Sequence, residues 1–509
     1  MAGAPRRSLT VPAVVEYDRA VRSLPRSVLV GLVALLALRL GIAAVLPLGD
    51  DEAYYWDWSH HLAAGYVDHP PAIAVLIWAA RHLVANPGIA VHGVAAVLSF
   101  ATSIALFALA REVLGRDDTA TWAVILFNIV PVFAGGGLLA APDAPLGLCW
   151  VLALLWTWRA VRRGGLGAWA AAGVTTGFAL QSKYTGAFLP VSIGLWLALA
   201  PSHRHWWRRW EPYGAAALAL GVFAPVLWWN AGHHWVSFAA DATRSGWSGH
   251  RNLPIFLALE LAYLGPLMLP ALLGALIVAA WRGMRGDDAA LFLAAGGIPI
   301  IAATFGASLA GQVKGHWAAP GYVTATIALA GLATVRPRPV RDAAWRPLAA
   351  AAVASTAAVT VLVYALPAIG PAWLPPRLDP TVDYAGWRAA APEILAAARS
   401  GARGPYFITT DRYQVMAQFD LYAGGRIPTT TITDRDQYGI WASWPALRGW
   451  DGLFVEDGRY PIQVDLGAGC GAVEPARTIP VVRHGVVVRT LDLVWCRGFL
   501  GRPLPAVPR

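Results

Sequence analysis

The feature that most constrains this chain is a series of apolar runs, each close to 20 residues long, over its first 366 residues. A helix of that length crosses about 30 Å of hydrocarbon. The runs predict eleven membrane-spanning helices, at about 27–48, 88–110, 119–138, 144–161, 166–182, 184–200, 213–229, 254–280, 288–309, 318–335 and 347–366. A shorter apolar stretch at 71–84 predicts a helix at the membrane interface. Composition agrees, because 57% of the residues are hydrophobic and only 14% are charged, against roughly 25% in soluble domains.

The basic residues of the loops predict how the chain is oriented. With the segment 1–26 in the cytoplasm, nineteen arginines fall in cytoplasmic segments, and five basic residues fall in the short loops on the other side, namely Arg81, Lys183, Arg244, Arg251 and Lys314. An excess of arginine and lysine marks the cytoplasmic side of membrane proteins. The net charge of +10 is therefore explained by topology, and no nucleic-acid partner is expected.

Beyond residue 366 the sequence changes character. An odd number of spans places the tail, 367–509, outside the cytoplasm. Short apolar runs at 405–410, 452–455, 478–482 and 486–488 alternate there with helical stretches at 392–399 and 413–422, as in a small α/β domain. The sequence thus predicts an all-α polytopic membrane domain at 27–366, with a first outer loop at 49–87, followed by an extracytoplasmic α/β domain. Cys470 and Cys496 lie in this tail, where an oxidising compartment favours a disulfide between them.

Acidic and aromatic residues gather at the outer ends of the expected spans. Asp50, Asp51 and Glu52 follow the first span, and Asp143 begins the fourth. Adjacent carboxylates repel one another, which raises their pKa values and suits one of them to act as a base near neutral pH. The tyrosines and tryptophans at 54–58 are explained equally well by an aromatic belt at the membrane interface.

Lysines and histidines mark further candidate positions. Lys183 and Lys314 are the only lysines among forty basic residues, and a compact ammonium suits a phosphate. His233 and His234, together with Asp68, are candidate ligands of a divalent metal, although adjacent histidines lack the i, i+4 spacing of a helical metal site. No cofactor is required by these residues. The D-x-D spacing at 434–436 is interpreted as a solvated turn.

Seven short motifs, taken in order, carry a family resemblance. They are Asp51–Trp56, Tyr66–Pro71, Pro142–Pro145, Ser182–Thr185, Trp229–Asn230, His234–Phe238 and His316–Pro320. Together they resemble the GT-C glycosyltransferases. Within that fold they are most similar to the bacterial group like the dolichyl-phosphate-mannose protein mannosyltransferases, which includes aminoarabinose transferases of lipid A and lipopolysaccharide-core sugar transferases of rhizobia.

The resemblance implies an inverting transferase at the outer face of the bacterial plasma membrane. Its donor would be a sugar on a polyprenyl phosphate, and its acceptor a hydroxyl of an extracytoplasmic lipid, glycan or protein. Asp51, with Glu52 beside it, matches the proposed base, and Asp143 matches a second acid that orients the acceptor or a metal. Aminoarabinose transferases have a lysine where this chain has His69. The residues expected to bind substrate are Tyr54, Tyr55, Asp68, His69, Lys183, His234, Trp235, Arg244, Arg251, Lys314 and His316.

Two other classes of function remain open on the sequence. A transporter or a flippase of lipid-linked sugars would be expected to have charges at the middle of the membrane, broken helices and inverted repeats. A scaffold protein would use the outer tail as its functional module. The crowding of polar residues at the outer helix ends favours the transferase.

Overall fold

The computed structural model describes residues 24–504 except 245–251, 312, 335–341, 371–374, 376–378, 380, 426, 434–436 and 461. The chain divides into two compact units. The helical unit comprises Met1–Ile42, His69–Ile73 and His92–Val363, and the sheet unit comprises Ala43–Asp68, Ala74–Val91 and Tyr364–Arg509. Most of the first outer loop, expected with the membrane domain, therefore packs with the C-terminal segment.

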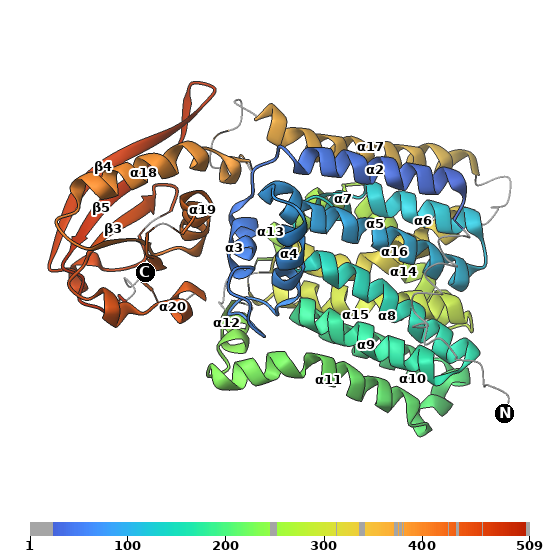
Figure 1. Cartoon of the computed structure of the whole chain (residues 1–509). Coiled ribbons are helices and arrows are strands. Elements are labelled where there is room, and N and C mark those ends of the chain that lie inside the picture. Colours follow the sequence, from blue (N-terminus) through green and yellow to red (C-terminus); the bar gives the residue numbers. More distant parts are fainter. Residues whose placement is uncertain are drawn as a thin grey trace, which may run out of the picture. The chain divides into compact units, whose positions relative to one another are not determined.

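Figure 1 labels most of the elements in chain order. The α-helices are α2 (Arg26–Ala43), α3 (Asp50–Trp58), α4 (Ala72–Leu83), α5 (Pro87–Leu114), α6 (Asp117–Ile129), α7 (Pro131–Gly136), α8 (Asp143–Arg163), α9 (Leu166–Ser182), α10 (Phe188–Leu199), α11 (Glu211–Gly232), α12 (Val236–Arg244), α13 (Leu253–Leu264), α14 (Met268–Gly283), α15 (Asp288–Ser308), α16 (Ala319–Thr334), α17 (Asp342–Ile369), α18 (Trp387–Gly401), α19 (Tyr413–Ala423) and α20 (Gln437–Trp441). The 3₁₀ helices are η1 (Tyr184–Ala187), η2 (Pro201–Arg208), η3 (Gly315–Ala318), η4 (Val382–Tyr384), η5 (Trp444–Leu447) and η6 (Leu466–Ala468). The strands are β1 (Tyr406–Thr410), β2 (Thr429–Thr431), β3 (Asp451–Asp457), β4 (Ala472–Arg483) and β5 (Val486–Arg497).

Helices occupy each range in which the sequence predicts a membrane span, and the chain is a multi-pass membrane protein. Among the described residues, six helices are long and apolar enough to cross a membrane: α2, α5, α8, α11, α15 and the 347–366 part of α17. Counting two bent helix pairs as one span each raises the number to eight. α6, α9 and α16 lie at the other expected positions and are shorter, with 13, 17 and 16 residues.

The expectation of one continuous span at 254–280 is wrong. α13 ends at Leu264 and α14 begins at Met268, and the two helices are bent by 95°. Gly265 has φ +92°, a conformation that L side chains rarely adopt, and Pro266 has no N–H to continue a helix. These two residues explain the break.

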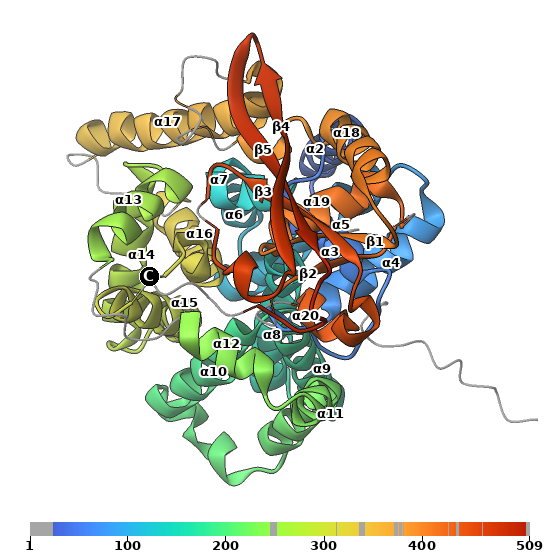
Figure 2. The same ribbon diagram turned by 90° about the vertical axis from the view of Figure 1, so that its left-hand side faces the viewer.

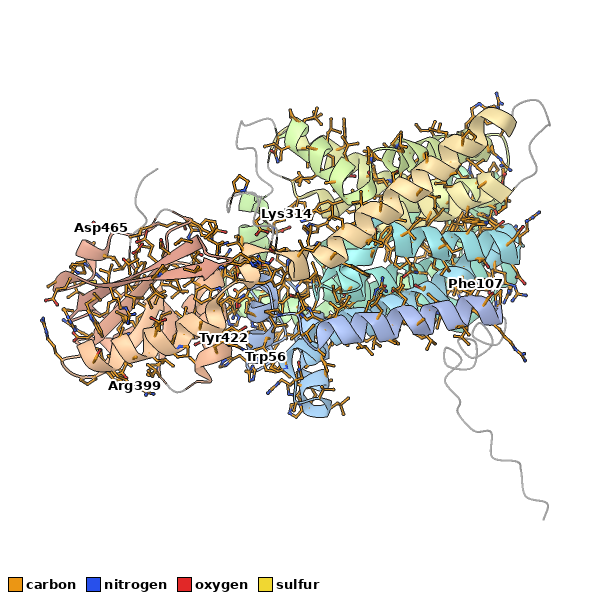
Figure 3. The ribbon with its side chains drawn as sticks, turned by 90° about the horizontal axis from the view of Figure 1, so that it is seen from above. Trp56, Phe107, Lys314, Arg399, Tyr422 and Asp465 are labelled. Carbon is orange, nitrogen blue, oxygen red and sulfur yellow. A yellow bond between two sulfur atoms is a disulfide. The ribbon has the colours of Figure 1, made fainter. Side chains whose placement is uncertain are left out.

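The helical unit is held together by apolar packing and by close helix approaches. Its core runs through α5, α8, α14, α15 and α16, and Phe107 of α5 is fully buried in it (Figure 3). Gly173 and Gly177 lie one turn apart on α9 and face α11. A Cβ atom at Gly173 would lie 2.3 Å from the carbonyl oxygen of Ala215, and one at Gly177 would lie 2.8 Å from that of Ala219. The two glycines therefore let the backbones of α9 and α11 come into contact, as small residues do between membrane helices.

The sheet unit is built on a mixed five-stranded sheet of order β2-β1-β3-β5-β4. β1 runs parallel to β2 and β3, while β5 runs antiparallel to β3 and β4. Side chains alternate between two cores: Ile408 and Leu453 pack with α18 and α19 on one face, and Phe407 and Phe454 pack with the C-terminal loops on the other. The expected α/β character of the tail is confirmed.

Two further features complete the sheet unit. Cys470 and Cys496 form the expected disulfide, with Cα atoms 5.1 Å apart. The long hairpin of β4 and β5 extends past the other strands of the sheet, as Figures 1 and 2 show.

Candidate active site

The acids of the first outer loop lie in the first turn of α3. Carboxylates at this position interact favourably with the exposed N–H groups of a helix start. Glu52 accepts a hydrogen bond of 3.0 Å from the backbone N–H of Gly49, the residue before the helix, and is 4% exposed. Glu52 therefore caps α3.

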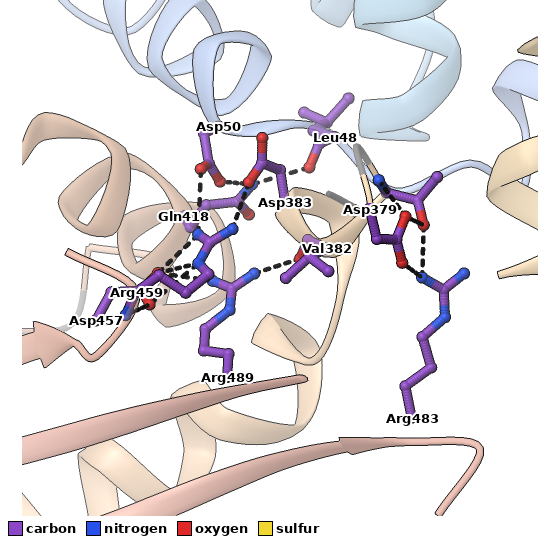
Figure 4. A network of polar contacts seen from close by, with 11 residues as sticks. Leu48, Asp50, Asp379, Val382, Asp383, Gln418, Asp457, Arg459, Arg483 and Arg489 are labelled. Carbon is purple, nitrogen blue, oxygen red and sulfur yellow. Dashed lines mark hydrogen bonds and ion pairs between the residues drawn. The ribbon is translucent and has the colours of Figure 1, made fainter. Parts of the chain in front are cut away.

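Asp50 joins α3 to α19 within the sheet unit. Its Oδ1 accepts a hydrogen bond of 3.0 Å from the amide of Gln418 on α19, which also donates to the carbonyl of Leu48 (Figure 4). The guanidinium of Arg459 lies 3.8 Å from Asp50. Burial raises the pKa of Asp50 to about 7, and repulsion from Asp383 adds to the rise. This rise in pKa is limited by the positive charges of Arg489 and Arg459 and by the hydrogen bond from Gln418.

Asp51 is the exposed acid in the first turn of α3, whereas Asp50 and Glu52 are buried. The hydroxyl of Tyr413, at the start of α19, donates a hydrogen bond of 2.9 Å to Asp51 Oδ1. Burial and the negative charge of Asp51 raise the pKa of Tyr413 well above its ordinary value. The phenol therefore keeps its proton at neutral pH and holds one oxygen of the Asp51 carboxylate.

Tyr54 and Tyr55 are packing residues in this structure. Both are buried, and the ring of Tyr54 stacks on those of Tyr413, at 4.4 Å between centroids, and Tyr438, at 5.7 Å. The Tyr54 hydroxyl donates to Asp68 Oδ2 at 3.0 Å and accepts from the backbone N–H of Gln437 at 3.2 Å. These contacts place Asp68 beside the aromatic group rather than in solvent.

A second group of predicted residues comes together within the helical unit. Both oxygens of Asp143, in the first turn of α8, accept hydrogen bonds of 2.8 Å from Lys183, directly after α9. Lys183 is 4% exposed. His316 and His69 are close enough to interact electrostatically with Asp143. Burial and the positive charge of Lys183 lower the pKa of His316 to about 4, so its imidazole is neutral at pH 7.

The remaining predicted residues are exposed or lie outside the described structure. Lys314, labelled in Figure 3, is exposed directly before η3. His234 and Trp235 have φ values of +55° and +57°, a strained turn between α11 and α12. The side chain of Arg244 and all of Arg251 lie outside the described residues, as does the D-x-D motif at 434–436.

The metal hypothesis finds no ligand set in the structure. His233 stacks on Trp229, with ring centroids 4.0 Å apart, and its Nδ1 lies 2.8 Å from the carbonyl oxygen of that residue. Among the residues that the structure describes, no three His, Cys, Asp or Glu side chains converge as ligands of an ion.

Sequence reasoning missed the residues of the sheet unit that contact α3. Tyr413, Gln418 and Tyr438 follow their partners Asp51, Asp50 and Asp57 by 362, 368 and 381 residues. The periodicity at 413–422 indicated a helix but not its partner. In the sequence, polar residues that contact such a distant segment cannot be distinguished from those of an ordinary helix face exposed to solvent.

Comparisons with known proteins give the family context. Residues 68–229 match the family model described as dolichyl-phosphate-mannose-protein mannosyltransferase. The chain is 27% identical, over 285 residues, to the lipid A galacturonosyltransferase RgtD of Rhizobium johnstonii, covering 54% of this chain. The match spans 59% of the length of RgtD, less than two thirds.

Solved structures of ArnT from Cupriavidus metallidurans are similar in fold. The structure bound to undecaprenyl phosphate gives a TM-score of 0.62 at 15% identity, covering 92% of this chain and 97% of that one. The apo structure gives 0.60 at 14% identity, covering 91% and 97%. The predicted resemblance is confirmed: the chain has the GT-C fold and resembles bacterial glycosyltransferases of the protein-mannosyltransferase-like and ArnT-like group.

Proposed function

We propose that the protein is an inverting glycosyltransferase that moves a sugar from a polyprenyl phosphate to a hydroxyl of an extracytoplasmic lipid, glycan or protein. The observation that carries the proposal is Asp51, an exposed carboxylate at the start of α3 that accepts a hydrogen bond from Tyr413. Similarity to a lipid A galacturonosyltransferase and to a protein solved with undecaprenyl phosphate supports it. The site of reaction is proposed to be the outer face of the bacterial plasma membrane, with the N-terminus in the cytoplasm.

The chemistry needs a base and a stabilised leaving group. The acceptor oxygen attacks the anomeric carbon while the bond from that carbon to the phosphate oxygen breaks. Asp51 takes the hydroxyl proton, and the polyprenyl phosphate leaves as an anion. Tyr413 is a positioning residue in this scheme, because it touches the base and not the substrate.

Charge balance guides the assignment of the phosphate contacts. Asp143 neutralises Lys183, so this pair adds no net charge for an anionic donor. Lys314 is exposed two residues before His316, which interacts with the pair. We therefore infer that the Asp143–Lys183 pair holds the ends of α8 and α9 together, and that Lys314 is the candidate within the helical unit for binding the donor phosphate.

A transporter of lipid-linked sugars is the second candidate function. The 95° break between α13 and α14 favours it, because broken helices are typical of transporters.

One assay distinguishes transfer from transport. Purified protein in proteoliposomes is given a panel of polyprenyl-phosphate sugars with lipid A, glycan and peptide acceptors, and transfer is followed by mass spectrometry. Movement of the donor across the bilayer is measured in parallel. Transport without transfer on any acceptor would overturn the proposal.

Asp51→Asn tests the base. We expect transfer to fall by a factor of about 100 or more, since a positioned general base contributes roughly 10²–10⁴. Asp50→Asn is the matched control: it changes the neighbouring acid in the same way, at a carboxyl whose pKa near 7 leaves it largely protonated in slightly acidic buffer. Full activity of Asp51→Asn would contradict the assignment.

A further inference from the structure

The tip of the β4–β5 hairpin carries exposed apolar side chains. Val482, Val486 and Val487 are 57%, 46% and 50% exposed, and the turn between them consists of His484 and Gly485. The tip lies at the far end of the extended hairpin (Figure 2). The core of the sheet unit includes Ile479, Val481 and Leu491, so it ends before the tip.

The valines occupy both faces of the hairpin. Val482 pairs with Val487, and Arg483 pairs with Val486. Paired residues of an antiparallel ladder share a face, and successive residues point to opposite faces. A strand with one face in water normally alternates apolar and polar residues. Exposed valines therefore lie on both faces of the tip, although one of these faces also carries Arg483.

Contacts of Arg483 place the tip beside the end of a membrane span. A Cβ atom at Gly370 would lie 2.0 Å from the guanidinium of Arg483, which also donates to Thr381 at 2.6 Å and to Asp379 at 3.3 Å (Figure 4). Gly370 directly follows α17, whose segment 347–366 is long and apolar enough to cross a membrane.

The rise per residue of α17 gives the distance of the tip from the end of the apolar segment 347–366. Gly370 lies four residues beyond Leu366, which is roughly 6 Å at 1.5 Å per residue. That distance reaches the headgroup region, which adds about 5–8 Å to the hydrocarbon on each side. Arginine is favourable at this level, with its stem in apolar surroundings and its charge among headgroups.

We propose that residues 482–487 insert their valines into the interfacial layer of the lipid bilayer on the side where α17 ends. The partner is the lipid surface itself. The hairpin then holds the sheet unit to the membrane at a point additional to the chain connections. The proposal does not depend on the reaction that the protein catalyses.

A site-directed fluorophore tests the insertion. The full chain carries Cys149→Ala, keeps the Cys470–Cys496 disulfide, and receives an environment-sensitive label at Val487→Cys. The matched control is Ala476→Cys, an exposed position on β4. It lies six residues before Val482, the residue that pairs with Val487, or about 20 Å away at 3.3 Å per residue. Each protein is placed in nanodiscs with one copy per disc, which excludes contact with a second copy.

The two positions should report opposite environments. We expect the label at 487 to shift to the blue and to be quenched several-fold more strongly by lipids with a spin label near the headgroup than the label at 476. Iodide in the buffer should quench the label at 476 more strongly. Equal quenching by lipid and by iodide at both positions, in protein that elutes as a single folded species, would overturn the proposal. Introducing Val482→Asp and Val486→Asp together should abolish the lipid quenching at 487, and quenching that persists would also contradict insertion.

Discussion

Tyr413 is the residue that connects α19 to the proposed base. Its hydroxyl holds Asp51 Oδ1 at 2.9 Å. A hydrogen bond to a charged group contributes about 1.5–3 kcal/mol, or roughly 10- to 100-fold in rate if it acts on the transition state. Tyr413→Phe is expected to lower kcat by about 10-fold or more with little change in KM.

The pH profile distinguishes positioning from mere packing. A donor to the carboxylate lowers its pKa, so Tyr413→Phe should move the acidic limb of the kcat profile to higher pH. Tyr422→Phe, on the same helix but packed against the core of the sheet unit, is the control and should leave the profile in place. An unshifted limb in Tyr413→Phe would remove the positioning role.

Burial separates the three adjacent acids of α3 into different roles. Mutual repulsion along the sequence was the expected source of a raised pKa. The structure shows a raised pKa at Asp50, and burial is its largest cause, followed by Asp383, which is distant in sequence. Sequence identifies the acidic cluster, but burial and a distant neighbour decide which member changes its pKa.

At the scale of elements, the contact between α9 and α11 depends on two glycines. Gly173→Leu would drive its side chain into the backbone at Ala215. Overpacking of this kind costs about 1–3 kcal/mol. We expect the thermal unfolding midpoint of the protein in detergent to fall by several degrees.

Gly167→Leu is the matched control on the same helix. A Cβ atom at Gly167 meets nothing within 4 Å, so the same substitution should leave the midpoint close to that of the unmodified protein. Equal midpoints for Gly173→Leu and Gly167→Leu would show that α9 and α11 separate at little cost.

Elements were predictable where a local pattern defines them. Apolar runs located the helices, and short runs at 405–410 and 452–455 located β1 and β3. The break at Gly265 was missed because an apolar run through Gly-Pro reads as continuous by hydropathy. The contacts of Tyr413, Gln418 and Tyr438 with α3 were missed because they depend on packing between segments that no local pattern links.

At the scale of the whole molecule, pH should control how firmly the first outer loop packs in the sheet unit. Asp50 is the buried carboxyl of that packing, facing Gln418 of α19, Arg459 and Arg489, and Asp383 after α17. Its pKa in the folded protein, about 7, lies above the ordinary 3.8. The stabilisation from the protonated form is therefore complete below pH 3.8 and is lost as pH rises through about 7.

The unfolding midpoint of the sheet unit should accordingly fall between pH 5 and pH 8. A loss of about 2 kcal/mol, or a midpoint lower by roughly 5 °C, is expected for a unit of this size. Asp50→Asn, which keeps the shape of the protonated acid, should flatten this dependence, as measured by differential scanning calorimetry in nanodiscs. A slope that Asp50→Asn leaves unchanged would assign the pH dependence to other groups.

The sheet unit combines segments from the N-terminal and C-terminal parts of the chain, which determines when it can fold during synthesis. Asp51 leaves the ribosome 362 residues before Tyr413, its partner. At about 20 residues per second, roughly 20 s of synthesis separate the two. During that time α3 has no docking surface, and Asp50, Glu52 and Tyr54 have yet to be buried. The first outer loop is therefore translated early but can pack only after almost the whole chain has been inserted. The proposed active site is consequently among the last parts of the protein to form.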